Sequence, residues 1–139
     1  MTAQYSPLFA ASGLRDTQPR RIVFQALQKQ KKALTPHDLQ VALAAKKTDL
    51  NIVTLYRILE AFEKANIVHK HPCNGAFSLC TIPAQKGHHG FMHCSECNVV
   101  EEFSDKELCH LEHGIAKKAG FAPHNHVSEI MGTCKSCRS

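Results

Sequence analysis

The chain has 139 residues, of which 43% are hydrophobic and 21% are charged, with a formal net charge of +5. This length corresponds to one or two small domains. It contains no run of about 18 apolar residues, which excludes a membrane-spanning helix, and its first residues lack the basic and apolar segments of a secretory signal. The composition also excludes a collagen-like or wholly disordered chain. We therefore expect a globular protein of the cytoplasm that does not associate with a membrane.

The most unusual feature of the composition is its content of ten histidines and seven cysteines. The cytosol keeps thiols reduced, so a disulfide framework is not expected there, and the odd number of cysteines argues against one as well. These residues are better interpreted as metal ligands.

Charge and metal-binding residue types are distributed unevenly along the chain. Residues 1–80 hold eleven Lys and Arg against five Asp and Glu, a balance of +6. Residues 81–139 hold six against seven, a balance of −1, together with seven of the ten histidines and five of the seven cysteines. A basic small domain is typical of proteins that bind polyanions, although an ordinary solvated surface would show the same bias.

The basic half contains signals for three helices. A first helix is expected to begin at Gln18 or Pro19 and to continue to about Gln30, since proline is favoured in a first turn. Thr35-Pro36-His37-Asp38 resembles a helix start with a hydroxyl cap, and that helix runs to about Lys46. Asn51 can cap a third helix, in which apolar residues recur at helical spacing: Ile52, Leu55, Leu59 and Phe62.

Two strand-like runs follow, residues 67–71 and 76–80, and Asn74-Gly75 between them is a hairpin signal. Three helices and a hairpin predict a winged helix-turn-helix, in which the third helix enters the major groove of DNA. Arg57 is then placed for base edges or phosphate, and Thr54 and Tyr56 for phosphate or a thymine methyl group. The alternative is a helical bundle with an arginine on its surface.

The second half contains two CxxC pairs, Cys94/Cys97 and Cys134/Cys137, separated by 36 residues. Each pair presents two thiolates to one ion, so the two pairs together predict a four-cysteine zinc site. The long separation requires a subdomain between the pairs, and the sequence supplies strand-like residues 91–103, a helix over 105–120 and a strand over 127–131. A thioredoxin-like redox site needs only one pair and leaves the second unexplained.

A second metal site is expected where the halves join. His69 and Cys80 come from the hairpin, and His88 and His89 follow a short linker of residues 81–87. A site that combines His69, Cys80, one of these two histidines and an acidic residue would fix the two halves relative to each other. A thiolate among nitrogen ligands favours zinc over ferrous iron or manganese.

Taken together, these stretches resemble the ferric-uptake-regulator family of bacterial metal-dependent repressors over nearly the whole chain. The matching residues are Gly13 to Arg20, Val53-Thr-Leu-Tyr-Arg-Ile-Leu59, His88-His89, Cys94-x-x-Cys97 up to Glu102-Phe103, His126 and Cys134-x-x-Cys137. The resemblance implies an α+β fold: a winged-helix DNA-binding domain, residues 1–82, and a zinc-stabilised α/β dimerisation domain, residues 83–139. It also implies a homodimer whose metal-loaded form binds an AT-rich palindrome and represses transcription.

Within the family the chain is most similar to the zinc uptake regulators, because iron sensors tend to have Glu at the position of Cys80. The resemblance implies a zinc sensor site of His69, Cys80, His89 and Glu102, with His88 and His71 as alternates. It implies a third site of His88, Cys109 and His126, where Cys109 occupies the place of an acid. Arg20 joins Thr54, Tyr56 and Arg57 among the expected DNA contacts.

The expected function is a zinc-responsive repressor of zinc-acquisition genes. An iron- or peroxide-responsive member of the same family is the main alternative. A zinc-storing interaction protein would explain the His and Cys content but not the basic helix. An enzyme is not expected: His110-Leu-Glu112 is not followed by the Pro-Cys-x-x-Cys of a deaminase, and no His-Glu-x-x-His is present.

Overall fold

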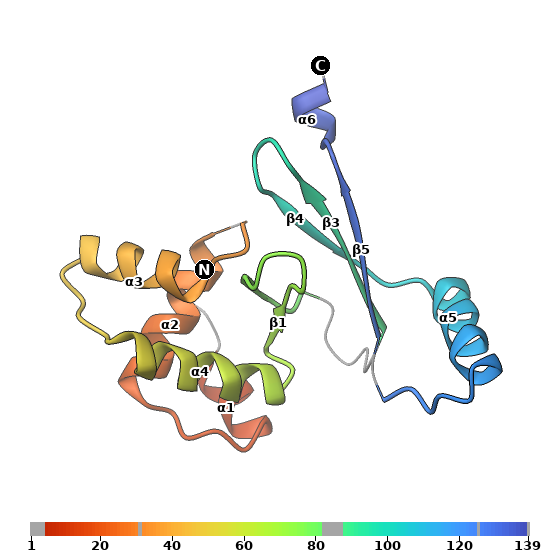
Figure 1. Cartoon of the computed structure of the whole chain (residues 1–139). Helices are drawn as coiled ribbons and strands as arrows, with labels where there is room; N and C mark the ends of the chain where they lie inside the picture. Colours follow the sequence, from red (N-terminus) through yellow and green to blue (C-terminus); the bar gives the residue numbers. More distant parts are fainter. Residues whose placement is uncertain (1–4, 31, 82–87, 125, 139) are drawn as a thin grey trace. The chain divides into compact units, whose positions relative to one another are not determined.

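The computed structural model describes residues 5–30, 32–81, 88–124 and 126–138. The chain divides into two compact units, Met1–Cys80 and Thr81–Ser139, and each is described here by itself (Figure 1). The domain boundary expected between residues 82 and 83 falls outside the described residues.

The first unit contains four helices: α1 (Tyr5–Ala11), α2 (Gln18–Lys29), α3 (Pro36–Ala45) and α4 (Ile52–Lys64). The expected starts of the last three are confirmed, since Thr17, Thr35 and Asn51 are their N-caps and each side chain accepts a hydrogen bond from a backbone N–H. Thr35 and Asp38 form a complete capping box. These caps satisfy backbone donors that the first helical turn leaves without partners.

The predicted hairpin is confirmed as β1 (Val68–Lys70) and β2 (Phe77–Leu79), which are antiparallel with His69 opposite Ser78. The turn between them uses Gly75 in the left-handed region, at a φ of +70°, which glycine adopts without strain. Asn74 also stabilises the turn, because its side chain accepts a hydrogen bond from Ala76 N. Helices α2 to α4 and this wing therefore form the winged helix-turn-helix that was expected.

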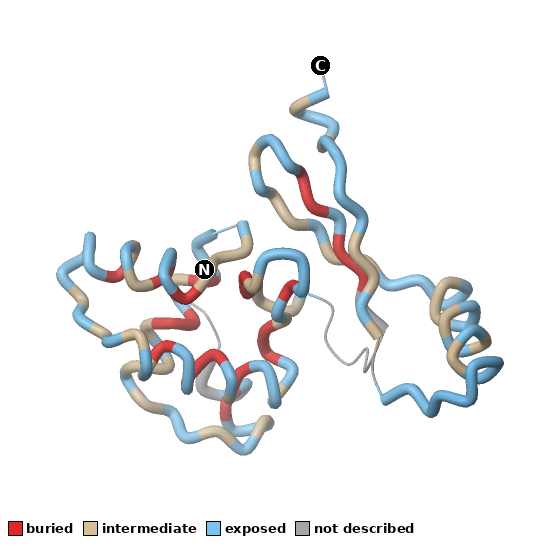
Figure 2. The backbone as a smooth tube through the Cα atoms, viewed as in Figure 1, coloured by how far each residue is buried: buried red, intermediate tan, exposed pale blue. Residues whose placement is uncertain are grey.

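The core of the first unit lies among its helices and the wing, where the buried segments are drawn red in Figure 2. Helix α1 was not predicted, yet it contributes the fully buried Phe9, whose ring lies 5.4 Å from that of Phe62 and 5.9 Å from that of Phe24. The other buried core residues come mainly from α2, α3, α4 and the wing: Val23, Leu27, Leu39, Leu43, Leu55, Ile58, Leu59, Ile67, Val68 and Phe77.

The second unit is a three-stranded sheet with two helices. Its strands are β3 (His88–Cys94), β4 (Val100–Phe103) and β5 (His126–Gly132), in the order β4-β3-β5, with β4 antiparallel and β5 parallel to β3. The predicted strand over 91–103 is thus two strands with a tight turn between them, in which Asn98 has a φ of +62°. The parallel pair requires a crossover, and α5 (Lys106–Lys118), capped by Asp105, provides it. A short α6 (Lys135–Arg138) ends the unit.

The second unit buries few side chains. Within residues 90–124 and 126–138, the buried side chains are Phe91, His93 and Cys94, all on β3. Neither α5 nor α6 has a buried residue. Packing of apolar side chains therefore holds this unit together far less than it does the first, and polar and metal-binding groups must supply the remaining attachments. In the described part of the chain, no helix is long and apolar enough to cross a membrane.

Candidate metal centres and nucleic-acid interface

The four cysteines of the two CxxC pairs come together at one end of the sheet. Cys94 ends β3, Cys97 lies in the following turn, Cys134 follows β5, and Cys137 lies on α6. Their four sulfur atoms all lie within 4.8 Å of one another, and the Sγ atoms of Cys97 and Cys134 are 3.8 Å apart. A tetrahedral ion with Zn–S bonds of about 2.3 Å places its sulfurs about 3.8 Å apart. The arrangement therefore fits the predicted four-cysteine zinc site.

The charges of these thiols also suit a cation. Backbone N–H groups around Cys94, led by that of Cys134 at 3.3 Å from its Sγ, lower the pKa of Cys94 to about 6. The pKa of Cys137 is raised to about 12, mainly through the neighbouring sulfur of Cys134 and through burial. Backbone donors thus favour one thiolate, whereas the neighbouring sulfur atoms and burial keep another thiol protonated. A divalent cation at the centre removes that conflict.

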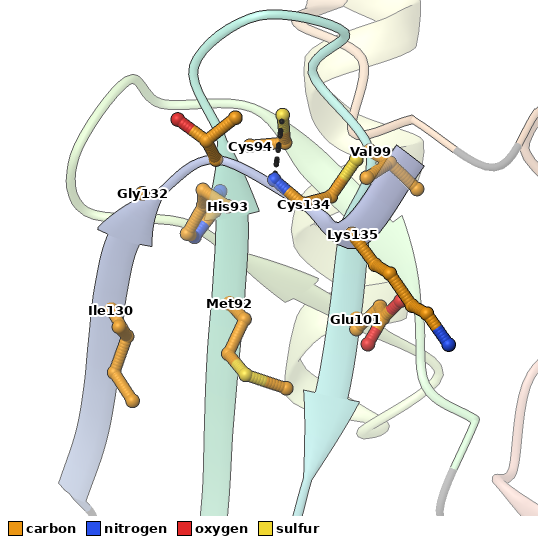
Figure 3. A pocket seen from close by; sticks show the side chains of 10 residues that line it. Met92, His93, Cys94, Val99, Glu101, Ile130, Gly132, Cys134 and Lys135 are labelled. Carbon is orange, nitrogen blue, oxygen red and sulfur yellow. Dashed lines mark hydrogen bonds between the residues drawn. The ribbon is translucent and has the colours of Figure 1, made fainter. Parts of the chain in front are cut away.

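A cavity of about 400 Å³ lies beside this cluster on one face of the sheet. Figure 3 shows Met92 and Ile130 on neighbouring strands of this face, with Glu101 and Lys135 to one side. Met92 is 40% exposed and Ile130 is 55% exposed. The cavity is therefore an open, largely apolar surface with charged residues at its margin.

The first unit brings two of the expected sensor ligands together. His69 lies on β1 and Cys80 directly follows β2, and each offers a ligand atom within 4.8 Å of the other. The hairpin register explains this, since Val68 pairs with Leu79 and Cys80 N donates to Ile67 O. Both side chains are half-buried. A thiolate and an imidazole in this arrangement suit a borderline-soft ion such as zinc.

The alternate ligand His71 is placed differently. Its side chain is buried, and its Nε2 forms a hydrogen bond with Ser78 Oγ at 2.8 Å. Its backbone also closes the wing turn through bonds with Gly75 and Ala76. These contacts give His71 a structural role in the turn of the wing.

The remaining expected sensor ligands belong to the second unit. Glu102 is a half-buried residue of β4, and its Oε1 accepts hydrogen bonds from Thr81 N at 2.8 Å and from Thr81 Oγ1 at 3.0 Å. This fixes one carboxylate oxygen of Glu102. His88 and His89 open β3, and their backbones pair with His126 and Val127 of β5. Their side chains lie outside the described residues.

A second cluster in this unit lies between α5 and β5. Cys109, His113 and His126 each offer a ligand atom within 4.8 Å of the other two. Of the residues expected for the third site, Cys109 and His126 are brought together here. His113 was not predicted, although it stands four residues after Cys109 on an expected helix and therefore on the same face. That spacing was the signal that could have found it.

The surroundings of this cluster tie α5 to the sheet. Glu112 contacts β5 twice, through Ser128 Oγ and through His126 Nε2, which lies 3.2 Å from its Oε2. The rings of His113 and His126 meet edge to face at 5.2 Å. On the neighbouring strand, a Cβ at Gly90 would overlap the ring of Phe103. Glycine at position 90 offers no ligand side chain, and the donors of this cluster come from α5 and β5.

The expected DNA contacts lie in the first unit. Tyr56 and Arg57 are exposed on α4 and Thr54 is half-buried there, whereas Leu55, Ile58 and Leu59 of the same helix are buried in the core. Arg20, in the first turn of α2, donates from Nη1 to Arg15 O at 2.8 Å. That bond holds the guanidinium at the start of α2.

Comparison with known proteins identifies the family to which a chain with this winged helix-turn-helix and these cysteine and histidine clusters belongs. The sequence pattern of the Ferric uptake regulator family matches residues 11–131. The chain belongs to that family. A "Ferric uptake regulation protein" of Legionella pneumophila is 33% identical over 128 residues, which are 91% of this chain and 93% of the relative.

Two solved structures of this family are similar over almost the whole chain. One is a zinc uptake regulator complexed with zinc and DNA, with 27% identity, a TM-score of 0.88, and coverage of 97% of this chain and 91% of the other. The other is the zinc uptake regulator XcZur in its holo form, with 26% identity, a TM-score of 0.84, and coverage of 96% and 94%. The expected fold class and family are thereby confirmed. The chain is a metal-responsive transcription regulator, and its family is not one of enzymes.

Proposed function

We propose that this chain is a zinc-responsive repressor of zinc-acquisition genes, acting in the cytoplasm as a homodimer on an AT-rich palindromic operator. The observation that carries the choice of zinc is the pairing of Cys80 with His69 in the wing. A thiolate ligand discriminates in favour of zinc over the harder ferrous and manganous ions. The likeness to two zinc uptake regulator structures supports the same choice, whereas the Legionella relative carries a ferric uptake name.

The four-cysteine cluster is proposed to hold a structural zinc. Cys94 and Cys97 would supply two thiolates and Cys134 and Cys137 the other two, which closes the site to water and substrate. Such an ion would join the turn after β3 to the end of β5, in a unit that buries few side chains. Structural zinc contributes about 10–16 kcal/mol of apparent folding free energy in small domains, so this unit is expected to depend on it.

The regulatory zinc is proposed to bind His69 and Cys80 of the first unit together with His89 and Glu102 of the second. Bound there, zinc supplies positive charge and a fixed coordination geometry. Since the ligands belong to both units, occupancy restricts the arrangements that the units sample, and the ion's differential affinity sets how far the population moves. Thr81 assists by holding one oxygen of Glu102.

A third ion is proposed between α5 and β5. The resemblance suggested His88, Cys109 and His126, and the geometry adds His113 as a donor from the same helical face as Cys109. Two imidazoles and one thiolate again favour zinc. Glu112, which contacts His126, would orient that imidazole from the second coordination shell.

Self-association is proposed through the sheet and α5 of the second unit. Apolar side chains there that are at least 40% exposed include Met92, Leu111, Ile115, Phe121, Val127, Ile130 and Met131. This much exposed apolar surface marks an interaction site rather than a monomer's surface. In addition, β5 is an edge strand with one side open to pairing. A second copy of the chain would cover both.

DNA binding is proposed through α4 and the start of α2. Arg57 would contact base edges or phosphate, Tyr56 and Thr54 phosphate or a thymine methyl group, and Arg20 the backbone or the adjacent groove. The balance of +6 over residues 1–80 supports an encounter with a polyanion.

The test is binding of the full chain to promoter fragments of its source genome at fixed salt, with free zinc, ferrous iron and manganese each buffered separately. The proposal expects a retarded dimer complex that appears at low free zinc and requires far higher iron or manganese. Binding switched on by iron alone would favour the iron-responsive alternative. Binding indifferent to metal would contradict regulation by these sites.

A further inference from the structure

The exposed face of α4 carries an apolar residue that no expected role accounts for. Val53, Tyr56, Arg57 and Glu60 are exposed and lie at positions i, i+3, i+4 and i+7, so they share one side of the helix. Val53 is 55% exposed in the first turn. The opposite side of α4 is buried in the core of the first unit.

Helix stability does not explain Val53. A β-branched side chain lowers helix propensity relative to alanine, and at this exposure it adds little to the core. The cap does not need it either, since Asn51 Oδ1 already accepts the bond from Thr54 N at 2.8 Å. The side chain of Val53 is therefore available to contact a partner. That contact must be apolar, because valine has no hydrogen-bonding group with which to bind a phosphate or a hydroxyl.

Charge along α4 indicates which part of this face meets a polyanion. Glu60 and Glu63 are exposed in its second half, where they would repel phosphates, whereas Arg57 lies nearer the start. Helices of this fold contact base edges with their N-terminal residues. Val53 therefore lies on the half of α4 that is suited to enter the major groove.

In the major groove, the C5-methyl group of thymine is the apolar feature that distinguishes base pairs. We propose that Val53 packs its isopropyl group against a thymine methyl in each half-site and so specifies thymine at that position. This inference rests on the proposed DNA binding and adds a sequence-reading residue to it. Arg57 and Tyr56 then supply polar contacts beside an apolar one.

The test removes the methyl group from the DNA and the isopropyl group from the protein, alone and together. A duplex is selected from a random library with the zinc-loaded full-length protein, and each thymine is then replaced by uracil in turn. The wild-type chain is expected to lose affinity about fourfold at one thymine per half-site, the factor for one methylene-sized contact. Val53→Ala changes both protomers of the dimer, so it should bind the parent duplex about sixteenfold more weakly, about fourfold for each half-site, and show no further loss at either thymine.

Two variants serve as controls. Val41→Ala removes a valine of similar exposure, 57%, from α3, and should keep the full uracil penalty. Val53→Thr keeps one methyl group and should keep part of the uracil penalty. It therefore separates loss of the contact from any change in the fold of Val53→Ala. If no thymine shows a penalty that disappears in Val53→Ala, the inference is overturned while DNA binding stands. If the wild-type chain selects no duplex, the proposed function fails and this inference fails with it.

Discussion

Single side chains decide which metal each candidate site can hold. Cys80 beside His69 and Cys109 beside His113 both place a thiolate next to an imidazole. A carboxylate at either position would give a harder site that suits iron or manganese. These two cysteines are the residues on which the proposed preference for zinc rests in each unit.

The site between α5 and β5 gives a prediction at this scale. Cys109→Ser and His113→Ala should each lower the zinc bound after dialysis against buffered metal from three ions per chain to two, because each removes one of three donors. His110→Ala is the matched control, since His110 is exposed on the same helix and outside the cluster. In the cobalt-substituted protein, Cys109→Ser should also weaken the thiolate-to-metal absorption. Equal zinc content in the wild type and both variants would contradict a metal site in this cluster.

Among single residues, the sequence predicted those metal ligands that belong to a motif of known spacing. The two CxxC pairs predicted the four-cysteine cluster, because two such pairs commonly bind one zinc ion. His113 was assigned to no site, although its spacing from Cys109 puts the two on one helix face, because the sequence does not show which strand lies against that face. Phe103 over Gly90 was equally hidden, because cross-strand register brings them together and local sequence does not encode register.

At the scale of the element, β3 is the centre of the second unit. It pairs with β4 on one side and β5 on the other, and it carries the buried Phe91, His93 and Cys94. Gly90 lies opposite Phe103 in the β3–β4 register, and the phenylalanine ring covers the space that a side chain would take. The ring of Phe103 therefore covers the β3–β4 pair at the point where Gly90 has no side chain to do so.

Two glycine substitutions test this packing. Gly90→Ala should lower the free energy of unfolding of the zinc-loaded second unit by roughly 1–3 kcal/mol, the usual cost of overpacking, because its Cβ overlaps the ring of Phe103. Gly114→Ala is the counterpart, since a Cβ on α5 there meets no atom within 4 Å. It should raise that free energy by about 0.5–1 kcal/mol through helix propensity. Urea unfolding measures both, and equal stability of Gly90→Ala and wild type would contradict the role of Phe103.

The starts of α2, α3 and α4 were predictable to within a residue or two because their signals act locally: Pro19 in the first turn of α2, and the caps Thr35 and Asn51 of the other two helices. Helix α1 was not predicted, and its contribution to the structure rests on Phe9, whose ring packs against those of Phe24 and Phe62 in the core. Tertiary packing determines α1, and a local sequence pattern carries no information about such packing.

In the molecule as a whole, different interactions stabilise the two units. The first has a continuous apolar core and is expected to fold without metal. The second buries three side chains within residues 90–124 and 126–138 and gathers cysteine, histidine and carboxylate groups instead. This division suits a regulator in which metal binding controls the arrangement of a DNA-binding unit that is always folded.

In the proposed mechanism, zinc bound through Cys80 switches DNA binding on. The most direct measurement is operator affinity across buffered free zinc for the wild-type chain, Cys80→Ser and Cys73→Ser, where Cys73 is an exposed thiol of the same wing. We expect Cys80→Ser to need about a hundredfold more free zinc for binding, a factor that corresponds to about 2.8 kcal/mol of affinity at the site. It should remain a dimer with its four-cysteine zinc, and Cys73→Ser should match the wild type. Superimposable zinc curves for Cys80→Ser and the wild type would contradict the account.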